Sequence, residues 1–114
     1  MSWTTVCPLS SVPAGRGVCA LVEDVQVALF RTAAGSLHAV DNRDPRSGAM
    51  VLSRGIVGSR GARPVVVSPM FKHAFDLESG VCMDDPELRV AVHEVTVHAG
   101  FVGVRLAGRV ALSA

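Results

Sequence analysis

The sequence contains no tyrosine, one tryptophan and four phenylalanines in 114 residues. So few aromatic side chains cannot form a platform on which unpaired bases stack, and a formal net charge of +1 gives no general attraction to phosphates. No run of apolar residues is long enough to cross a bilayer. We therefore expect neither nucleic acid nor a membrane as the partner of this protein.

Cysteine is also scarce. The three cysteines, Cys7, Cys19 and Cys82, are far apart and form no C-x-x-C pair, which argues against both a disulfide framework and a zinc ribbon. We interpret them as buried free thiols, because cysteine is often buried for packing alone. The first ten residues have neither the basic start nor the apolar stretch of a secretory signal, so we expect a cytoplasmic protein.

The motifs of common enzyme classes are absent from the sequence. It has no G-x-G-x-x-G and no P-loop, and Ser68 precedes Pro69 instead of lying in a G-x-S-x-G elbow. His93 and His98 alone have a spacing that metal sites use, but they fall on opposite faces of one predicted strand. We therefore predict no catalytic residue and no metal ligand in this chain.

The pattern of valines predicts an all-β fold. Valine is the commonest residue, and its short runs are separated by Gly, Pro, Asn, Asp or Ser. Residues 18–34 also fit helical spacing, but Glu23 and Asp24 stand where a hairpin turn would lie, and β-branched residues disfavour a helix, so we predict two strands there. The clearest strands are 89–98 and 101–106, residues 25–31 and 36–40 read as a hairpin, and 64–67 and 72–77 are plausible strands.

Residues 41–82 differ from the rest, because glycine and proline interrupt them repeatedly. We predict a single domain in which 1–40 and 83–114 form an antiparallel β-sandwich or barrel base, and 41–82 form a smaller inserted lobe. Six basic residues against one acid fall in 42–72, whereas 76–94 carry six acids against one arginine. This asymmetry indicates either two solvated faces or a docking surface. The six basic residues are Arg43, Arg46, Arg54, Arg60, Arg63 and Lys72.

Two motifs in the insertion resemble the Rieske family of iron–sulfur domains. The first reads DPRSGA from Asp44, and the second reads SPMFKHAFDLESG from Ser68. The family has C-P-H-x-G-A and C-P-x-H-G-x-x-F-D-x-x-x-G at these places, where two cysteines bind one iron and two histidines the other. The prolines and the later Phe-Asp keep the frame, but the ligand positions are Asp44, Arg46, Ser68 and Phe71.

These four side chains cannot hold a two-iron cluster, because a guanidinium only donates hydrogen bonds and a phenyl ring has no donor atom for iron. We expect Phe71 to pack inward into the former cluster pocket. We also expect Asp44 and Arg46 to form hydrogen bonds or an ion pair there.

From Trp3 to Val104, words such as VALFR, DNRDP, VLSRGIVG and VCMDDP look like the family of small subunits of assimilatory NAD(P)H nitrite reductase. The resemblance implies a cofactor-free accessory subunit of a cytoplasmic complex that reduces nitrite to ammonia in nitrate assimilation. The flavin (FAD), sirohaem and iron–sulfur cluster would belong to the large subunit, which is the implied partner.

The resemblance also implies that the tip of the lobe meets this partner. The residues expected to bind it are Arg43, Arg46, Arg54, Lys72 and His73. Alternatively, the arginines pair internally with Asp41, Asp44 and Asp76. Two other functions remain open at this point, a stand-alone Rieske-like interaction module of another oxidoreductase and an electron-transfer ferredoxin.

Overall fold

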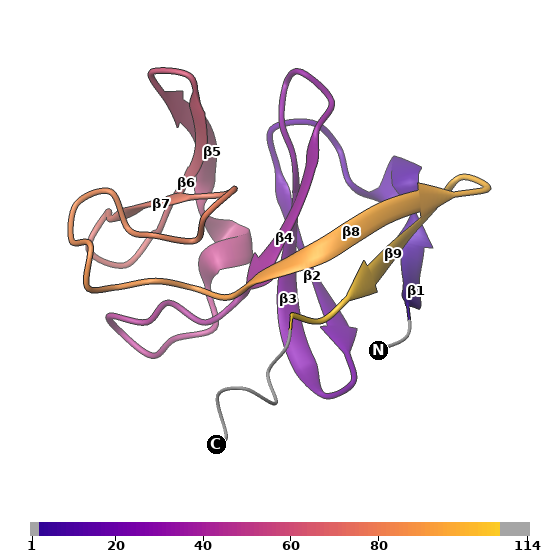
Figure 1. Cartoon of the computed structure of the whole chain (residues 1–114), viewed down its shortest axis with the longest axis horizontal. Coiled ribbons are helices and arrows are strands. Elements are labelled where there is room, and N and C mark those ends of the chain that lie inside the picture. The colour runs from indigo at the N-terminus through magenta and orange to yellow at the C-terminus, as the bar shows by residue number, and fades with distance from the viewer. Residues whose placement is uncertain (1–2, 108–114) are drawn as a thin grey trace.

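The structure, a computed structural model, describes residues 3–107, which form two antiparallel sheets (Figure 1). The strands are β1 (Thr4–Pro8), β2 (Gly17–Val22), β3 (Val25–Arg31), β4 (Leu37–Asp41), β5 (Ile56–Arg60), β6 (Arg63–Val67), β7 (Ala74–Asp76), β8 (Val92–His98) and β9 (Phe101–Arg105). In 3–107 the helical segments are two short 3-10 turns, η1 (Leu9–Ser11) and η2 (Leu52–Arg54). The predicted all-β fold is confirmed.

The larger sheet has six strands in the order β1-β9-β8-β4-β3-β2 and curls so that its edge strands, β1 and β2, approach each other. Glu23 and Asp24 form the tight turn between β2 and β3, with φ angles of 50° and 71°. The prediction of two strands within 18–34 is therefore correct. A core of valines with Leu29 and Ala39 fills the inside of this nearly closed barrel.

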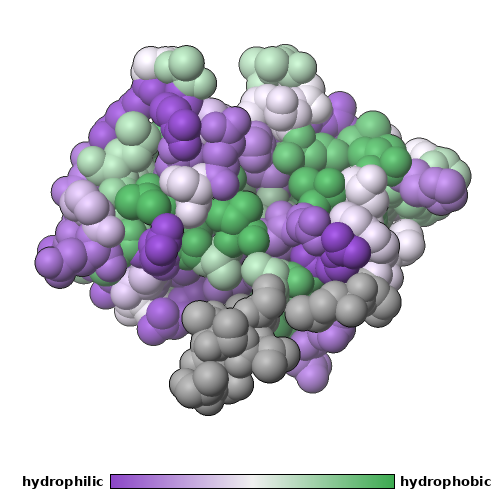
Figure 2. Space-filling view, in the orientation of Figure 1, coloured by the Kyte–Doolittle hydropathy of each residue, from purple (hydrophilic) through white to green (hydrophobic). Residues whose placement is uncertain are grey.

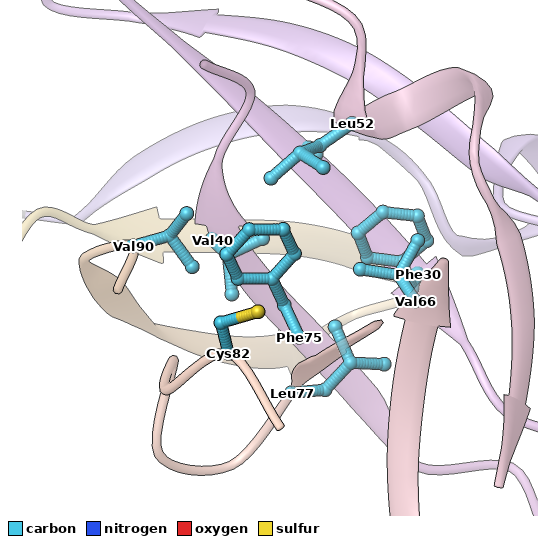
Figure 3. Packing of buried hydrophobic residues seen from close by; sticks show 9 residues of the cluster. Phe30, Val40, Leu52, Val66, Phe75, Leu77, Cys82 and Val90 are labelled. Carbon is cyan, nitrogen blue, oxygen red and sulfur yellow. The ribbon is translucent and has the colours of Figure 1, made fainter. Parts of the chain in front are cut away.

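The smaller sheet, in the order β5-β6-β7, lies beside the barrel (Figure 1). A second core joins the two sheets, since Phe30 and Val40 come from the barrel and Val66 and Phe75 from the small sheet (Figure 3). All four are fully buried. This shared core fixes the small sheet, and with it the loops that leave its ends.

Some boundaries differ from those predicted. Strands β1 and β5 were not predicted, and in β5 Gly58 and the glycines around it disguise the strand pattern. Strand β7 begins at Ala74 instead of residue 72, because the two residues at 71–72 have left-handed backbone conformations. Residues 108–114, part of the predicted base, lie outside the described residues. No helix in 3–107 is long and apolar enough to span a membrane.

The interpretation of the cysteines is only partly correct. All three are free thiols, and Cys82 is buried in the core between the sheets, but Cys7 is half-buried and Cys19 is exposed. Cys19 lies on β2, where its sulfur accepts a hydrogen bond from Asn42 Nδ2 at 3.5 Å. Partial burial raises the pKa of both the Cys7 and the Cys19 thiol, so both remain protonated near neutral pH.

Candidate functional site

Three loops meet at one end of the small sheet and carry the positions singled out by the two motifs. The first loop spans residues 42–51, the second 68–73 and the third 82–88. Asp44 of the first loop bonds Ser68 of the second, with 2.5 Å between Oδ2 and Oγ. Met83 N of the third loop donates to the carbonyl of Ala74, directly after the second loop, at 2.8 Å. We call the three loops together the loop cluster.

Asp44 is fully buried and organises the first loop. Its Oδ1 accepts hydrogen bonds from the backbone N–H groups of Arg46 at 2.8 Å and Ser47 at 3.4 Å. Its own N–H donates to the Ala49 carbonyl at 2.8 Å, and its carbonyl accepts from the Gly48 N–H at 2.7 Å. A short polar side chain that bonds the next backbone amides stabilises a tight turn.

Ser68 organises the second loop through hydrogen bonds, as Asp44 does in the first. Its hydroxyl donates to Asp44 and accepts the Met70 N–H at 3.1 Å, while its own N–H donates to the His73 carbonyl at 2.8 Å. Asp44 and Ser68 stand at the two positions that hold cysteines in the Rieske motif. A direct hydrogen bond thus joins the loops that two thiolates on one iron would otherwise link.

The expectation that Phe71 packs inward is wrong, because 62% of its surface is exposed. Phe71 and Lys72 have φ angles of 64° and 60°, and Phe75 is the phenylalanine of this motif that lies in the buried core. The Phe71 ring instead lies 5.4 Å from the Arg46 guanidinium carbon, and its edge meets the His73 ring at a centroid distance of 6.4 Å. Arg46 and Phe71, which stand at the two positions that hold histidine in the Rieske motif, therefore form a cation–π contact on the surface.

A two-iron cluster does not fit the side chains at these four positions. Arg46 and Phe71 offer no lone pair in place of imidazole nitrogen, and both oxygens of Asp44 already accept hydrogen bonds. Across residues 3–107, no group of three or more His, Cys, Asp or Glu side chains is placed to hold a metal ion.

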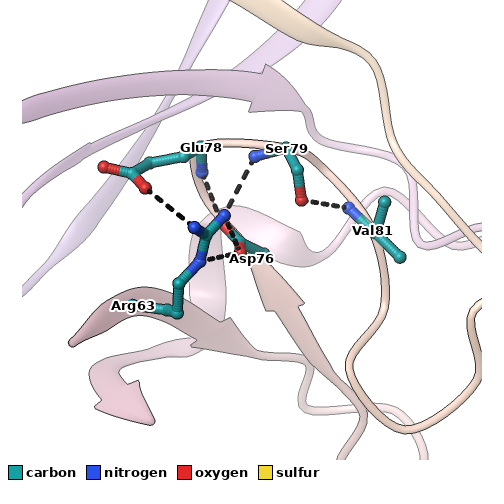
Figure 4. A network of polar contacts seen from close by, with 5 residues as sticks. All are labelled: Arg63, Asp76, Glu78, Ser79 and Val81. Carbon is teal, nitrogen blue, oxygen red and sulfur yellow. Dashed lines mark hydrogen bonds and ion pairs between the residues drawn. The ribbon is translucent and has the colours of Figure 1, made fainter. Parts of the chain in front are cut away.

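The acidic segment of the sequence folds back onto the basic one (Figure 4). Arg63 pairs with Asp76, at 2.5 Å between Nη2 and Oδ2, and its Nη1 lies 3.7 Å from Glu78. Arg60 pairs with Asp84 at 3.0 Å. Burial would raise the pKa of Asp76, but hydrogen bonds from Arg63 and from backbone amides outweigh this and keep the pKa below its usual value. Several charges of the basic and acidic segments therefore form ion pairs with each other inside the molecule.

Within residues 3–107, internal pairing with an arginine holds for Asp76 but not for Asp44. Asp76 pairs with Arg63, whereas Asp44 bonds Ser68 and Asp41 bonds His93 Nε2 at 2.7 Å. Nδ1 of His93 accepts the Ala107 N–H at 2.9 Å, which fixes its tautomer. In the part of the chain that the structure describes, three of the six basic residues of the 42–72 segment form no ion pair, namely Arg43, Arg54 and Lys72.

The structure gathers most of the residues predicted to bind a partner. Arg43, Arg46 and Lys72 are exposed on the first two loops, and His73 is half-buried beside them. Arg46 lies 3.9 Å from Asp85, whereas Arg43, Arg54 and Lys72 form no ion pair within residues 3–107. Arg54 belongs to η2, which lies between the two sheets (Figure 1), and no hydrogen bond or ion pair in the described residues links its side chain to the loop cluster.

Three exposed methionines were not anticipated as site residues. Met50, Met70 and Met83 lie on the first, second and third loop and are 40%, 39% and 39% exposed. Their apolar character predicts burial, so nothing in the sequence alone marks them as surface residues.

A groove of about 440 Å³ opens between the β3–β4 loop and the β5–β6 hairpin, visible as the notch at the top of Figure 2. Nε2 of His38 is buried there without a hydrogen-bond partner. Burial lowers the pKa of His38 more than the nearby carboxylates of Glu78 and Asp76 raise it, so the ring is neutral at neutral pH. Within the described residues no hydrogen bond joins His38 to a serine or threonine, and the groove offers no activated nucleophile.

Comparison with known proteins shows similarity to a Rieske-like domain family and to nitrite reductase small subunits. The family of the Rieske-like [2Fe-2S] domain matches residues 2–105. The nitrite reductase (NADH) small subunit of Escherichia coli K12 is 36% identical over 104 residues, which cover 90% of this chain and 96% of that one. A crystal structure described as an NADH-dependent nitrite reductase small subunit from Mycobacterium tuberculosis is 51% identical, covers 93% of this chain and 96% of its own, and superposes with a TM-score of 0.88.

A third relative is much longer than this chain. The NAD(P)H nitrite reductase large subunit of Klebsiella oxytoca is 38% identical over 102 residues. The match covers 90% of this chain but only 11% of that large subunit. A stretch similar to nearly the whole of this chain therefore occurs inside a large subunit.

Proposed function

Because the chain belongs to the Rieske-like domain family and, within it, to the nitrite reductase small subunits, we propose that it is a cofactor-free accessory subunit of a cytoplasmic NAD(P)H nitrite reductase. The complex would reduce nitrite to ammonia in nitrate assimilation, with FAD, sirohaem and an iron–sulfur cluster in the large subunit. The hydrogen bond between Asp44 and Ser68 carries the cofactor-free part of the proposal, because it joins the two loops without a metal.

The large subunit is the proposed partner. The Klebsiella oxytoca large subunit supports this choice, because a stretch similar to this chain is there part of the same polypeptide. The same contact between separate chains would need its own binding energy.

We assign partner binding to the loop cluster, through Arg43, Arg46, Lys72 and His73, and we include Arg54 as the neighbouring cation on η2. Arg43, Arg54 and Lys72 are exposed and form no ion pair in the described part of the chain, so they are available to attract an acidic surface.

The test combines iron analysis with binding. The anaerobically purified chain is expected to contain no stoichiometric iron or sulfide, to bind the purified large subunit, and to change its nitrite-dependent NADH oxidation. Two iron and two sulfide per chain would favour the ferredoxin alternative. Absence of binding to an active large subunit would favour a stand-alone interaction module.

The charged part of the surface has a separate test. Lys72→Glu and Arg43→Glu are each expected to slow association with the large subunit about tenfold at low ionic strength, and much less at high salt, because salt screens exposed charges. Arg16→Glu is the matched control, since Arg16 is exposed but lies outside the loop cluster. Association rates measured across a salt series decide, and equal effects of all three variants would contradict the assignment.

A further inference from the structure

We propose that Phe71 is the apolar anchor through which this chain docks onto the large subunit of nitrite reductase, with Met50, Met70 and Met83 as the contact surface around it. The inference rests on the proposed function and names the chemistry of its partner surface. That surface would be an apolar recess on the large subunit, bordered by carboxylates.

The conformation of Phe71 is the first observation. A phenylalanine that is 62% exposed gains little from burial, and its φ of 64° places it in the left-handed region that non-glycine residues disfavour. Lys72 follows with a φ of 60°, at a position where the Rieske motif has glycine. Folding alone gives no reason for an aromatic ring at the apex of this turn. Strained residues of this kind concentrate at functional sites.

The ring is also held in place before any partner arrives. The hydroxyl of Ser68 donates to Asp44 and accepts the Met70 N–H, and the Ser68 N–H donates to the His73 carbonyl. These three hydrogen bonds fix the turn that carries Phe71. The Arg46 guanidinium lies against the ring. An anchor that is fixed in advance loses less conformational entropy on binding.

The methionines extend the apolar area over all three loops. Met50 forms a backbone bridge with Arg43 on the first loop, Met70 directly precedes Phe71, and Met83 bonds the Ala74 carbonyl. Methionine is flexible and polarizable, and it adapts to the shape of a binding partner. Aromatic residues, methionine and arginine are enriched at protein interfaces.

Charge decides between the large subunit and a second copy of this chain. Arg43 forms a backbone bridge with Met50 and Lys72 directly follows Phe71, so both cations lie beside apolar residues of this surface, and neither forms an ion pair within residues 3–107. A symmetric dimer through this surface would bring the same cations of two copies together, which costs energy. An acidic border on a different protein would pair with them. The Klebsiella oxytoca large subunit, which contains a similar stretch, indicates which protein that is.

The decisive variant is Phe71→Gly, because glycine adopts the left-handed conformation without strain. The dissociation constant for the purified, cofactor-loaded large subunit is expected to rise about 30-fold or more, as for a hot-spot residue, while the melting temperature stays equal or increases. Leu21→Ala is the matched control, since Leu21 is 66% exposed on β2, and its dissociation constant should stay within about twofold of the unsubstituted chain.

Three results overturn the inference, and they are distinguishable. If the unsubstituted chain binds and Phe71→Gly binds equally well, the anchor is wrong and the proposed function stands. If the unsubstituted chain does not bind an active large subunit, both are wrong. If sedimentation shows a dimer that Phe71→Gly abolishes, while binding to the large subunit is unchanged, the occupant of the surface is a second copy.

Discussion

Asp44→Ala is expected to lower the free energy of unfolding by about 3 kcal/mol, because it removes a fully buried carboxylate with three hydrogen-bond donors. The Ser68 hydroxyl and two backbone amides lose their acceptor at once. Urea unfolding followed by circular dichroism measures the loss. Glu87→Ala, an exposed change in the third loop, serves as the control and should stay within about 0.5 kcal/mol of the unsubstituted chain.

The same site allows the bond between the loops to be isolated. Ser68→Ala alone should cost about 2 kcal/mol, since it removes the hydrogen bond to Asp44 and the acceptor of the Met70 N–H. In Asp44→Ala/Ser68→Ala the losses should not add, because each single change already breaks the shared bond. Strictly additive losses would contradict a direct coupling between the two former cysteine positions.

Except for β1, the barrel strands were predictable because their signal is local. Residues 18–34 also fit helical spacing, but the turn residues Glu23 and Asp24 and the β-branched residues define β2 and β3 over a few positions, and the structure places both strands there. The frame of the two motifs was equally readable, since proline, glycine and Phe-Asp hold their spacing even without the ligands.

Whether the Phe71 side chain is buried or exposed was not predictable from the same motif. A motif fixes where a residue stands in the chain, whereas burial depends on the backbone angles of Phe71 and Lys72, which hydrophobicity does not reveal. The partners in the ion pairs were not predictable from the sequence for a different reason. Arg60 and Asp84 are 24 residues apart, and only the return of the third loop brings them together. Sequence therefore predicted a basic region, but not which of its charges would remain free.

Phe75→Ala is expected to lower the free energy of unfolding by about 4 kcal/mol, more than either Asp44→Ala or Ser68→Ala. Phe75 is fully buried in the core that joins the two sheets, next to Val66 of the small sheet and Val40 of the barrel (Figure 3). Its truncation removes apolar contacts and leaves a cavity that the surrounding strands cannot easily fill, since both sheets are held by their hydrogen-bond ladders.

Phe71→Ala is the matched control, because it makes the same chemical change four residues earlier. The exposed ring of Phe71 contributes little burial, so its removal should change the free energy of unfolding by less than about 1 kcal/mol. Since Phe30 and Phe75 lie in one shared core, Phe75→Ala should shift a single unfolding transition for the whole chain. Two separate transitions in calorimetry, one of them unchanged, would mean that the small sheet and its loops unfold independently of the barrel.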